Sequence, residues 1–271
     1  MRIARFTLDQ DPRYGVVEGE EGAEMIHVIG GDPLYTEISP TGQTHPLEDV
    51  RLLAPVIPRS KIIGVARNYR SAGAPGGPPV WFGKPNTTVI GPGDPIMLDA
   101  RVTAPAFHEA ELAIVIARLA KDVPAEAADK VILGYTVAND VGYRFGDAAL
   151  PDAVDSANGG AAANPDPRGF FAKWRDTFTP LGPWIETDLE PERGLAVRSW
   201  LDGQARQDGS TKDLLVGARE LVATASAVCT LLPGDVILTG TPGGAAPIEP
   251  GERVTCEVGG IGAITNPVVR R

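Results

Sequence analysis

The sequence predicts an α+β protein in which β-strands predominate. Its 271 residues include 32 glycines and 25 prolines, which favour tight turns over long helices. Most apolar residues occur in short alternating or continuous runs, a pattern that is typical of strands. Only the segment between residues 210 and 225 has a clear helical period. These observations predict many short strands, frequent turns and little helix.

The first 58 residues are predicted to form a small β-rich domain with its linker. Three strand-like runs, MRIARFTL, YGVVEGE and AEMIHVI, are separated by turn residues. Pro46, Pro55 and Pro58 then stiffen the crossing to the rest of the chain. We therefore place the domain boundary near residue 58 and assign residues 59–271 to a larger domain.

The charge of the chain bears on its partners and location. A net charge of −10 and a pI near 4.8 argue against binding a phosphate backbone, which needs clustered Lys and Arg. No apolar run is long enough to span a membrane, and the first 15 residues lack the apolar centre of a signal peptide. We therefore expect a cytoplasmic protein that acts on a small molecule and binds neither nucleic acid nor membrane.

The two cysteines are predicted to be reduced. Cys229 and Cys256 are far apart in the sequence, and each lies in an apolar or strand-like context. This pattern favours buried thiols over a disulfide or a zinc site.

The stretch from Phe107 to Arg144 contains the candidate site. Glu109 and Glu111 are two residues apart at the start of an apolar strand, so their side chains are expected on the same face. Asp140 follows a second strand-like run, from Val131 to Ala138, that can lie beside the first. The spacing thus predicts three carboxylates near one another.

Two interpretations of this acidic group remain open from spacing alone. Carboxylates held this close repel one another, and a hard divalent cation with oxygen ligands would compensate their charge. Alternatively, Glu109 and Glu111 form the solvated face of an edge strand. Alternation sends the neighbouring His108 to the opposite face, so we expect a packed histidine there and no metal ligand. His27 and His45 belong to no motif.

Other elements are predicted around this stretch. A buried strand is expected at Lys61–Val65 and a short helix at Pro124–Lys130. A hairpin should turn at Asp202-Gly203. Residues 71–79 and 147–168 are rich in Gly, Ala and Pro and are expected to be loops or lids. Ser210 and Asp213 resemble a capping box, and apolar residues from Leu214 to Ala225 recur at helical spacing.

Together, the motifs resemble the fumarylacetoacetate hydrolase family. The resemblance covers residues 60 to 271 and is carried by a set of segments in a fixed order. They are KIIGVARNY, FGKPNTTVIGPGDPI, HEAELAIVI, GYTVANDVGYR, KWRDTFTPLGPW, TLLPGDVILTGTP and IGAITNPVV. The resemblance implies a mixed β-sandwich roll, in which strands surround a metal site, as the catalytic domain.

The resemblance also implies roles for individual residues. Glu109, Glu111 and Asp140 match the carboxylates that bind Mg²⁺, or Mn²⁺ or Ca²⁺, in the family. The catalytic residues implied are Lys173, which lies near the metal, and Arg144, which follows the ANDV motif. Asp147 is added as a candidate catalytic residue because its carboxylate is available as a base. The substrate contacts implied are Thr241, Gly240, Asn68, Tyr69 and Lys84. Members of the family are usually homodimers, which we expect here as well.

The family chemistry sets the expected substrate class. Its substrates are β-diketones, oxoacids or their enols, which chelate the ion through two oxygens. The ion acts as a Lewis acid that stabilises an enolate, and Lys173 is expected to hydrogen-bond the developing charge.

The sequence departs from the family pattern at the lid. The family commonly has N-Y-x-x-H-x-x-E, in which the His and Glu activate water. Here Ala72 and Pro75 fill those positions, and neither side chain can carry a proton. Phe145 and Asp147 replace family residues after Arg144, and Gly243–Ala246 departs from the usual A-G-V-G. These changes affect the substrate side and leave the carboxylates and Lys173 unchanged.

Three hypotheses follow from this pattern. The first is a metal-dependent enzyme with a non-hydrolytic reaction, such as isomerisation, dehydration, decarboxylation or cyclisation. The second is a C–C bond hydrolase of acylpyruvate or β-diketone type that recruits Asp147 or Asp176 as its base. The third is a non-catalytic homologue with a binding or structural role.

Overall fold

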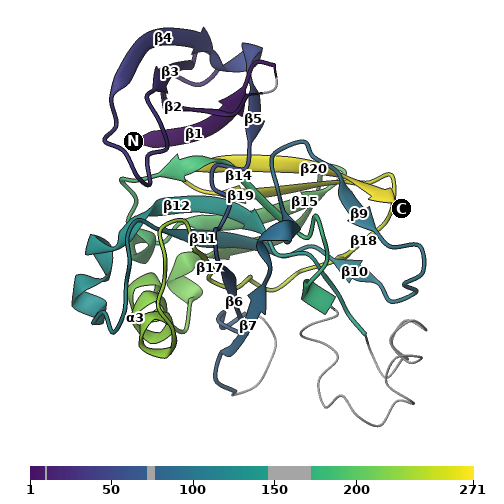
Figure 1. The fold of residues 1–271 in the computed structure, drawn as a ribbon. Helices are drawn as coiled ribbons and strands as arrows, with labels where there is room; N and C mark the ends of the chain where they lie inside the picture. Colours follow the sequence, from purple (N-terminus) through teal and green to yellow (C-terminus); the bar gives the residue numbers. More distant parts are fainter. Residues whose placement is uncertain (10, 72–76, 146–171) are drawn as a thin grey trace.

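The computed structural model describes residues 1–9, 11–71, 77–145 and 172–271, and it confirms the predominance of strands. These strands form three sheets, and one complete α-helix, α3 (Ala218–Val228), lies within the described ranges. Figure 1 shows a small N-terminal unit above a larger body that contains the remaining strands. Residues 72–76 of the predicted loop 71–79 and the whole predicted loop 147–168, and with them Ala72, Pro75 and Asp147, lie outside the described residues.

The N-terminal unit is an antiparallel arrangement of short strands. Phe6, Val17 and Ile26 pack together inside it. Strand β1 also pairs with β14, where Ile3 lies opposite Ile185, so this unit shares one sheet with the larger body. Its elements are β1 (Arg2–Thr7), β2 (Arg13–Glu18), β3 (Met25–Ile29), β4 (Pro40–Pro46), the 3₁₀ helix η1 (Leu47–Asp49) and β5 (Arg51–Leu53).

The same sheet continues through the centre of the molecule. Its strand order is β4-β3-β2-β1-β14-β12-β11-β17-β6-β7, with β5 and β8 paired to β1 and β14. The central strands are β6 (Ile62–Ala66), β7 (Val80–Lys84), β8 (Val89–Ile90), β11 (Ala110–Ile116), β12 (Ile132–Asn139), β14 (Thr179–Glu186) and β17 (Val236–Leu238). The buried strand predicted at Lys61–Val65 is confirmed as β6.

Strand β11 is buried along its whole length because both of its faces are covered. Leu112 and Ile114 belong to the largest apolar cluster, whereas Ala113 and Val115 belong to a second cluster on the other face. Strand β12 runs antiparallel beside β11, with Glu111 opposite Ala138. The predicted pairing of these two runs is confirmed, and it places the end of β12 beside the start of β11.

A second sheet packs against this centre and has the order β16-β15-β19-β20-β9. The predicted hairpin is confirmed, because β15 and β16 are joined at Asp202-Gly203, where both residues have positive φ. Its strands are β9 (Ile96–Leu98), β15 (Ala196–Leu201), β16 (Gln204–Ser210), β19 (Arg253–Val258) and β20 (Gly262–Arg270).

The apolar run that begins at Phe107 forms two strands instead of one, because its first residues belong to a small third sheet. It contains β10 (Ala106–Phe107), β13 (Gly142–Tyr143) and β18 (Pro247–Ile248). The chain leaves β10 and enters β11 only at Ala110, so Glu109 lies between two strands. The other short helices are η2 (Asn86–Thr88), η3 (Ala125–Lys130), η4 (Pro191–Arg193) and η5 (Thr211–Asp213), and η3 is the helix expected at Pro124–Lys130.

The predicted helix from Leu214 begins four residues later, at Ala218. Asn68 holds the intervening segment extended, because its backbone carbonyl accepts from Leu215 N–H and its side-chain oxygen accepts from Val216 N–H. Ser210 caps only the 3₁₀ turn η5, through Lys212 N–H. A tertiary contact with a distant segment therefore overrides the local helical pattern.

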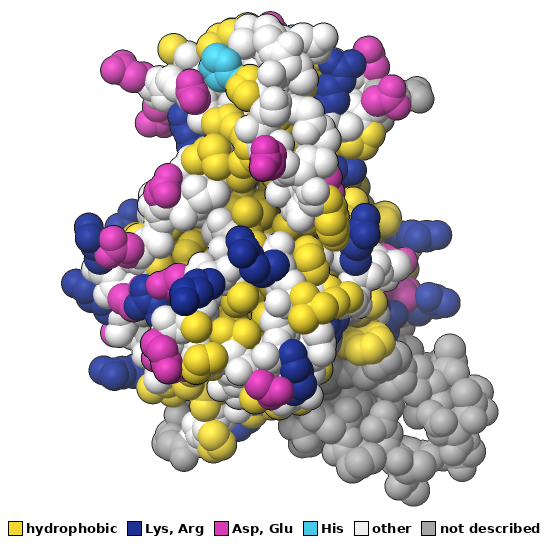
Figure 2. All heavy atoms as spheres, turned by 60° about the vertical axis from the view of Figure 1, so that its left-hand side comes forward, with side chains coloured by type: hydrophobic (Ala, Val, Ile, Leu, Met, Phe, Trp, Pro, Cys, Tyr) yellow, Lys and Arg dark blue, Asp and Glu magenta, His cyan; other side chains and the backbone are white. Residues whose placement is uncertain are grey.

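The surface carries mixed charges, and the thiols are free. On the face in Figure 2, Lys and Arg side chains are interspersed with Asp and Glu side chains. Cys256 is buried and Cys229 partly buried, and neither forms a disulfide. Among the described residues, no helix has the length and apolar character needed to cross a bilayer.

Candidate metal centre and active site

Three carboxylates meet where β11 begins and β12 ends. Each of Glu109, Glu111 and Asp140 offers an oxygen, and these oxygens all lie within 4.8 Å of one another. Glu111 and Asp140 are buried, while Glu109 is partly exposed. The burial rules out the alternative of a solvated edge-strand face for Glu111, because β11 lies between β12 and β17 inside the sheet.

Backbone contacts between the two strand ends fix this geometry. Asp140 N–H donates to the carbonyl of Glu109 at 2.8 Å, and the side chain of Asn139 accepts from Glu109 N–H at 3.0 Å. In the pairing of the two strands, Ala110 lies opposite Asn139, and Glu111 lies opposite Ala138 in the next pair. The antiparallel pairing therefore brings together carboxylates that are about 30 residues apart in the sequence.

Lys173 closes the cluster on one side. Its Nζ donates to Oε2 of Glu109 at 2.8 Å, to Oδ2 of Asp140 at 2.7 Å and to the carbonyl of Asp140 at 2.9 Å. Burial alone would lower the pKa of Lys173, but the charges of Asp140 and Glu109 outweigh it and raise the pKa. Lys173 is thus a protonated ammonium group fixed at the carboxylates.

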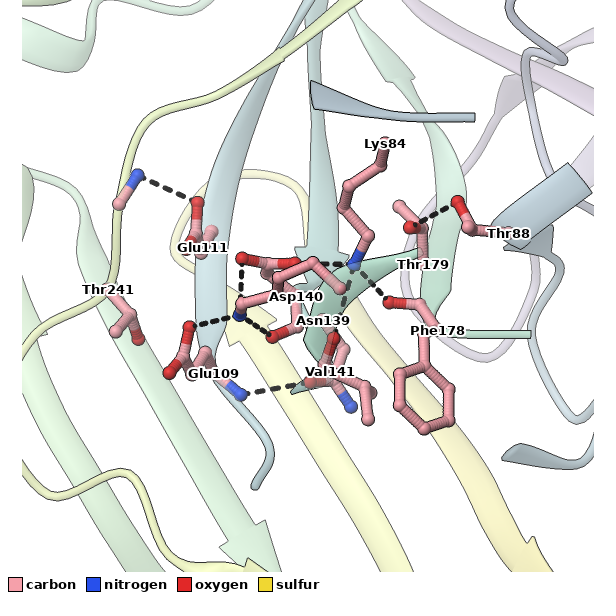
Figure 3. Close-up of polar contacts among 12 residues, drawn as sticks. Lys84, Thr88, Glu109, Glu111, Asn139, Asp140, Val141, Phe178, Thr179 and Thr241 are labelled. Atoms are coloured by element: carbon pink, nitrogen blue, oxygen red, sulfur yellow. Dashed lines mark hydrogen bonds and ion pairs between the residues drawn. The ribbon is translucent and has the colours of Figure 1, made fainter. Parts of the chain in front are cut away.

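Lys84 binds the opposite side of Asp140 (Figure 3). Its side chain is 0% exposed, and Nζ donates to Oδ1 of Asp140, to the carbonyl of Phe178 at 2.6 Å and to that of Val141 at 3.3 Å. The predicted substrate contact does not fit this position, because protein oxygens surround the ammonium group. Burial would raise the pKa of Asp140, but Lys173 and Lys84 lower it, so Asp140 is ionised.

Glu111 has the least compensated charge of the three. Its Oε2 accepts from Gly240 N–H at 2.7 Å, and no salt bridge to it occurs among the described residues. Burial, followed by the charges of Asp140 and Glu109, raises the pKa of Glu111 well above its usual range. A positive charge placed beside Glu111 would therefore be strongly favoured.

The loop at Thr239–Gly243 covers this end of the sheet. Gly240 has φ of 97°, and a Cβ there would lie 2.8 Å from the carbonyl of Val65, so glycine is required. The hydroxyl of Thr241 donates to the carbonyl of Ala110 at 2.8 Å and accepts from Gln207 Nε2 at 2.7 Å. Its single proton is committed to the protein, so Thr241 offers a lone pair to any ligand beside it.

A buried polar network behind Thr241 was not predicted. Gln207 accepts from Ala110 N–H and from the Ser199 hydroxyl, and it donates to Thr241 and to the carbonyl of Pro242. Ser199 in turn contacts Nε2 of His108 at 2.8 Å. The prediction of a packed His108 is confirmed, since the residue is 0% exposed and burial lowers its pKa to about 4.

Asn68 and Tyr69 lie beside the same loop. The Asn68 side chain donates to the carbonyls of Thr239 and Val216, at 2.9 and 3.0 Å, and is fully buried. Tyr69 forms a β-bridge with Leu214 and is also buried. Asn68 therefore fastens the loop to the segment that follows β6.

Arg144 and Asp176, the remaining predicted residues that the structure describes, lie in different places relative to the carboxylates. Arg144 reaches Oε1 of Glu109 at 3.4 Å and lies over the ring of Phe107, 3.7 Å from its centroid. Asp176 is exposed and lines a separate cavity of about 460 Å³ together with Asp99, Arg101 and Arg175. The structure thus brings Arg144 to the carboxylates and does not bring Asp176 to them.

The cluster fits a divalent cation. All three residues supply carboxylate oxygens, which hard cations such as Mg²⁺ prefer. The raised pKa of Glu111 indicates that Lys173 and Lys84 do not fully compensate the negative charge of the cluster. Glu109, Glu111 and Asp140 would hold the ion. When bound, it would supply positive charge that stabilises a negatively charged substrate oxygen.

The chain belongs to the fumarylacetoacetate hydrolase family. Residues 61–269 match the family described as fumarylacetoacetate (FAA) hydrolase C-terminal. Residues 1–55 match the family described as Rv2993c-like, N-terminal.

Three relatives cover the chain from end to end. The X-ray structure of 5-carboxymethyl-2-hydroxymuconate delta-isomerase from Mycobacterium smegmatis is 45% identical, covers 100% of both chains and has a TM-score of 0.84. Protein Rv2993c from Mycobacterium tuberculosis is 43% identical over 281 residues, covering 100% of this chain and 99% of the relative. Maleylpyruvate hydrolase from Sphingobium sp. SYK-6, whose structure is in complex with manganese(II) and pyruvate, is 31% identical over 100% and 99% of the chains, with a TM-score of 0.77.

Proposed function

We propose that this protein is a divalent-cation-dependent isomerase that moves a proton and a double bond within an enolisable oxoacid. The observation that carries the proposal is the position of Lys173, whose ammonium group lies within 2.8 Å of both Glu109 and Asp140. A substrate bound at this cluster would place an oxygen beside a fixed positive group. Such a group stabilises an enolate more than it stabilises the neutral ketone.

The reaction consumes no water. A proton leaves carbon or the enol hydroxyl, the negative charge spreads onto the 2-oxygen, and a proton returns at another carbon. Lys173 would hydrogen-bond the charged oxygen, and Arg144, at the partly exposed Glu109, would offer its guanidinium to a substrate carboxylate. The bound cation is proposed to be Mg²⁺, with Mn²⁺ or Ca²⁺ as alternatives.

Two observations favour isomerisation over hydrolysis. The sequence has Ala72 and Pro75 where the resemblance implies a water-activating His and Glu. Identity to the Mycobacterium smegmatis isomerase is 45%, whereas identity to maleylpyruvate hydrolase is 31%. Dehydration, decarboxylation and cyclisation also proceed through an enolate and are alternatives within the same class of chemistry.

A C–C bond hydrolase is the second candidate, supported by the similarity to maleylpyruvate hydrolase. It needs a general base for water, and Asp176 lies in a different cavity from the carboxylates. Asp147 therefore remains the carboxylate that such a mechanism would recruit. A non-catalytic homologue is the third candidate and requires that no substrate turns over.

The test follows proton transfer and bond cleavage in the same sample. The purified protein, treated with EDTA and then supplied with Mg²⁺ or Mn²⁺, is incubated in D₂O with 5-carboxymethyl-2-hydroxymuconate, oxaloacetate or maleylpyruvate. Loss of the enol absorbance reports isomerisation, NMR reports deuterium at carbon, and a lactate dehydrogenase assay reports released pyruvate.

The outcomes separate the candidates. Cation-dependent deuterium incorporation without cleavage supports the isomerase. Release of pyruvate from maleylpyruvate at a comparable rate supports the hydrolase, because that cleavage consumes water, whereas release of pyruvate from oxaloacetate marks a decarboxylase. Substrate binding with neither reaction favours the non-catalytic homologue. Glu111→Gln, which removes one carboxylate charge from the cluster, is the control for cation dependence and should be inactive in each assay.

A further inference from the structure

The peptide groups of Ala110 separate Glu109 from Glu111 in the acidic cluster. Strand β12 bonds the neighbouring residue, because the carbonyl of Glu109 accepts from Asp140 N–H. The N–H and the carbonyl of Ala110 point to the other side of β11, where β17 ends at Leu238. Ala110 is 0% exposed, so both of its backbone groups need partners within the protein.

Two side chains bond this peptide in place of a neighbouring strand. The register of β11 and β17, extended past the end of β17, would place Thr241 opposite Ala110. The chain turns at Gly240, whose φ is 97°, and the Thr241 hydroxyl reaches the carbonyl of Ala110 at 2.8 Å. On the other backbone group, Oε1 of Gln207 accepts from Ala110 N–H at 2.9 Å, and Gln207 is 2% exposed. Side chains from two distant segments thus complete the hydrogen bonding of Ala110.

Gln207 and Thr241 also bond each other and close a ring. Nε2 of Gln207 donates to the Thr241 hydroxyl at 2.7 Å and to the carbonyl of Pro242 at 2.8 Å. The amide has one possible orientation, because Oε1 faces an N–H that only donates and Nε2 faces a carbonyl that only accepts. The bonds run in one direction, from Ala110 N–H to Gln207, to Thr241 and back to the Ala110 carbonyl. Each bond in such a ring strengthens the next.

Close packing brings the loop against β16, the strand that carries Gln207. A Cβ on Gly209 would lie 2.5 Å from the Cβ of Pro242, and a Cβ on Gly244 would clash with the carbonyl of Arg206. Gly244 also has a φ of 98°. Glycine at these two positions therefore allows the approach through which one amide reaches both the loop and β11.

The ring acts on the acidic cluster through the directions of two side chains. Glu109 and Glu111 leave the backbone on either side of Ala110, so a rotation of the Ala110 peptide would move their carboxylates relative to each other. Glu111 also accepts from Gly240 N–H, at 2.7 Å, in the loop that the ring holds. The position of the loop and the spacing of the two carboxylates are therefore set together.

We propose that Gln207 is a positioning residue of the metal centre, which holds Glu109 and Glu111 in the arrangement that binds a divalent cation. It acts through the Ala110 peptide and Thr241 and is not a ligand itself. The role rests on the cation site of the proposed function. Partners that orient metal ligands in this way change metal affinity by about 10- to 100-fold when they are removed.

Gln207→Met tests the proposal, because it keeps the length of the side chain and removes all its hydrogen bonds. The affinity for Mn²⁺, measured by calorimetry, should fall by about 10- to 100-fold. Ser199→Ala is the matched control. Ser199 is 0% exposed and its hydroxyl bonds Gln207 and His108, so its loss weakens the same network but leaves the ring around Ala110 closed. Both variants should have lower melting temperatures, while Ser199→Ala should keep its Mn²⁺ affinity within about twofold.

A second pair of variants opens the ring from its other side. Thr241→Val removes the hydroxyl and should weaken Mn²⁺ binding by a similar factor, whereas Thr241→Ser keeps the hydroxyl and should retain the affinity. The double variant of Gln207→Met and Thr241→Val should bind Mn²⁺ within about threefold of the weaker single variant, because either substitution opens the same ring. Independent effects would multiply instead.

The outcomes separate this role from the proposed function. Wild-type Mn²⁺ affinity in Gln207→Met, or an equal loss in Ser199→Ala, would overturn the role of Gln207 and leave a cation-dependent isomerase intact. Multiplied losses in the double variant would overturn the ring. If Gln207→Met does not fold, the two Thr241 variants decide, and equal affinities in them would overturn the proposal. Failure of the wild type to bind Mn²⁺ would overturn both the role and the proposed function.

Discussion

Lys173 lies 2.7 Å from one oxygen of Asp140, and the buried ammonium group of Lys84 binds the other oxygen of the same carboxylate. The two lysines have different surroundings. Lys84 is enclosed by protein carbonyls, whereas Lys173 also contacts the partly exposed Glu109. Lys84 therefore holds one oxygen of Asp140 in the protein interior, and Lys173 binds the other oxygen at the carboxylate cluster. The two lysines thus have separable roles.

Replacing Lys84, which holds Asp140 in the interior, should mainly lower the stability of the fold. Lys84→Met leaves Asp140 buried beside a gap, and breaking a buried ion pair from one side lowers the free energy of unfolding by about 3–5 kcal/mol. Urea unfolding monitored by tryptophan fluorescence measures this change. Lys121→Met, at a lysine that is 42% exposed in its side chain, is the control and should change stability by about 0.5 kcal/mol or less. Equal stability of the two variants would contradict the anchoring role.

Replacing Lys173 should lower the rate of turnover and raise the affinity for a divalent cation. Lys173→Met removes a positive charge that lies within 2.8 Å of two carboxylates, so Mn²⁺ binding should tighten by about tenfold because a cation feels less repulsion. Turnover should fall on the order of 10²-fold because the enolate loses a charged donor. Calorimetry and initial rates measure the two effects.

The conservative variant Lys173→Arg provides the comparison for that experiment. It retains the positive charge, so its Mn²⁺ affinity should stay near the wild-type value. A parallel loss of Mn²⁺ affinity and turnover in Lys173→Met would mean that Lys173 only holds Glu109 and Asp140 in place.

Glu111→Gln should separate cation binding from folding. The variant removes the carboxylate whose pKa is raised by burial and by its acidic neighbours, while the amide oxygen can still accept from Gly240 N–H. Divalent-ion affinity should fall at least on the order of 10²-fold, and the ion-free protein should be as stable as the wild type or more stable. Calorimetry and thermal unfolding in EDTA test both statements. Unchanged ion affinity would contradict the assignment of the metal centre.

Much of this site could be predicted from the sequence because its signals are local. Glu109 and Glu111 are two residues apart, and Asp140 follows the neighbouring strand, so the pattern itself places the carboxylates together. The motif around Lys173 adds the lysine through a resemblance to a family. The domain boundary near residue 58, the homodimer and the roles of the site residues remain predictions.

The supporting residues could not be predicted, because their contacts are distant in the sequence. Gln207 bonds Ala110 and Thr241 across 97 and 34 residues, and a neutral amide in a hairpin has no pattern that marks it as buried. The resemblance brought Lys84 into the site as a substrate contact, but its ion pair with Asp140, 56 residues away, has no signal in the local sequence. The start of α3 was misplaced for the same reason, since Asn68 captures residues that have a helical period.

The buried His108 makes a prediction about acid stability. Burial lowers its pKa from 6.5 to about 4, with the hydrogen bond to the carbonyl of Ala246 too weak to offset it. Because this pKa is lower in the folded protein, His108 binds a proton more readily in the unfolded state. The stability that the neutral imidazole contributes is therefore fully present above pH 6.5. That contribution is lost as the pH falls towards 4, and it amounts to about 3 kcal/mol at 1.36 kcal/mol per pKa unit.

Unfolding in urea, measured in EDTA at several pH values between 7 and 4, checks this loss. His108→Gln cannot titrate, so the difference in unfolding free energy between wild type and variant should shrink as the pH falls from 6.5 towards 4. The comparison cancels the carboxylates that titrate in both proteins. A pH-independent difference for His108→Gln would mean that His108 keeps the same pKa in the folded and unfolded states, and that Ser199 and Ala246 stabilise its charged form as well as water does.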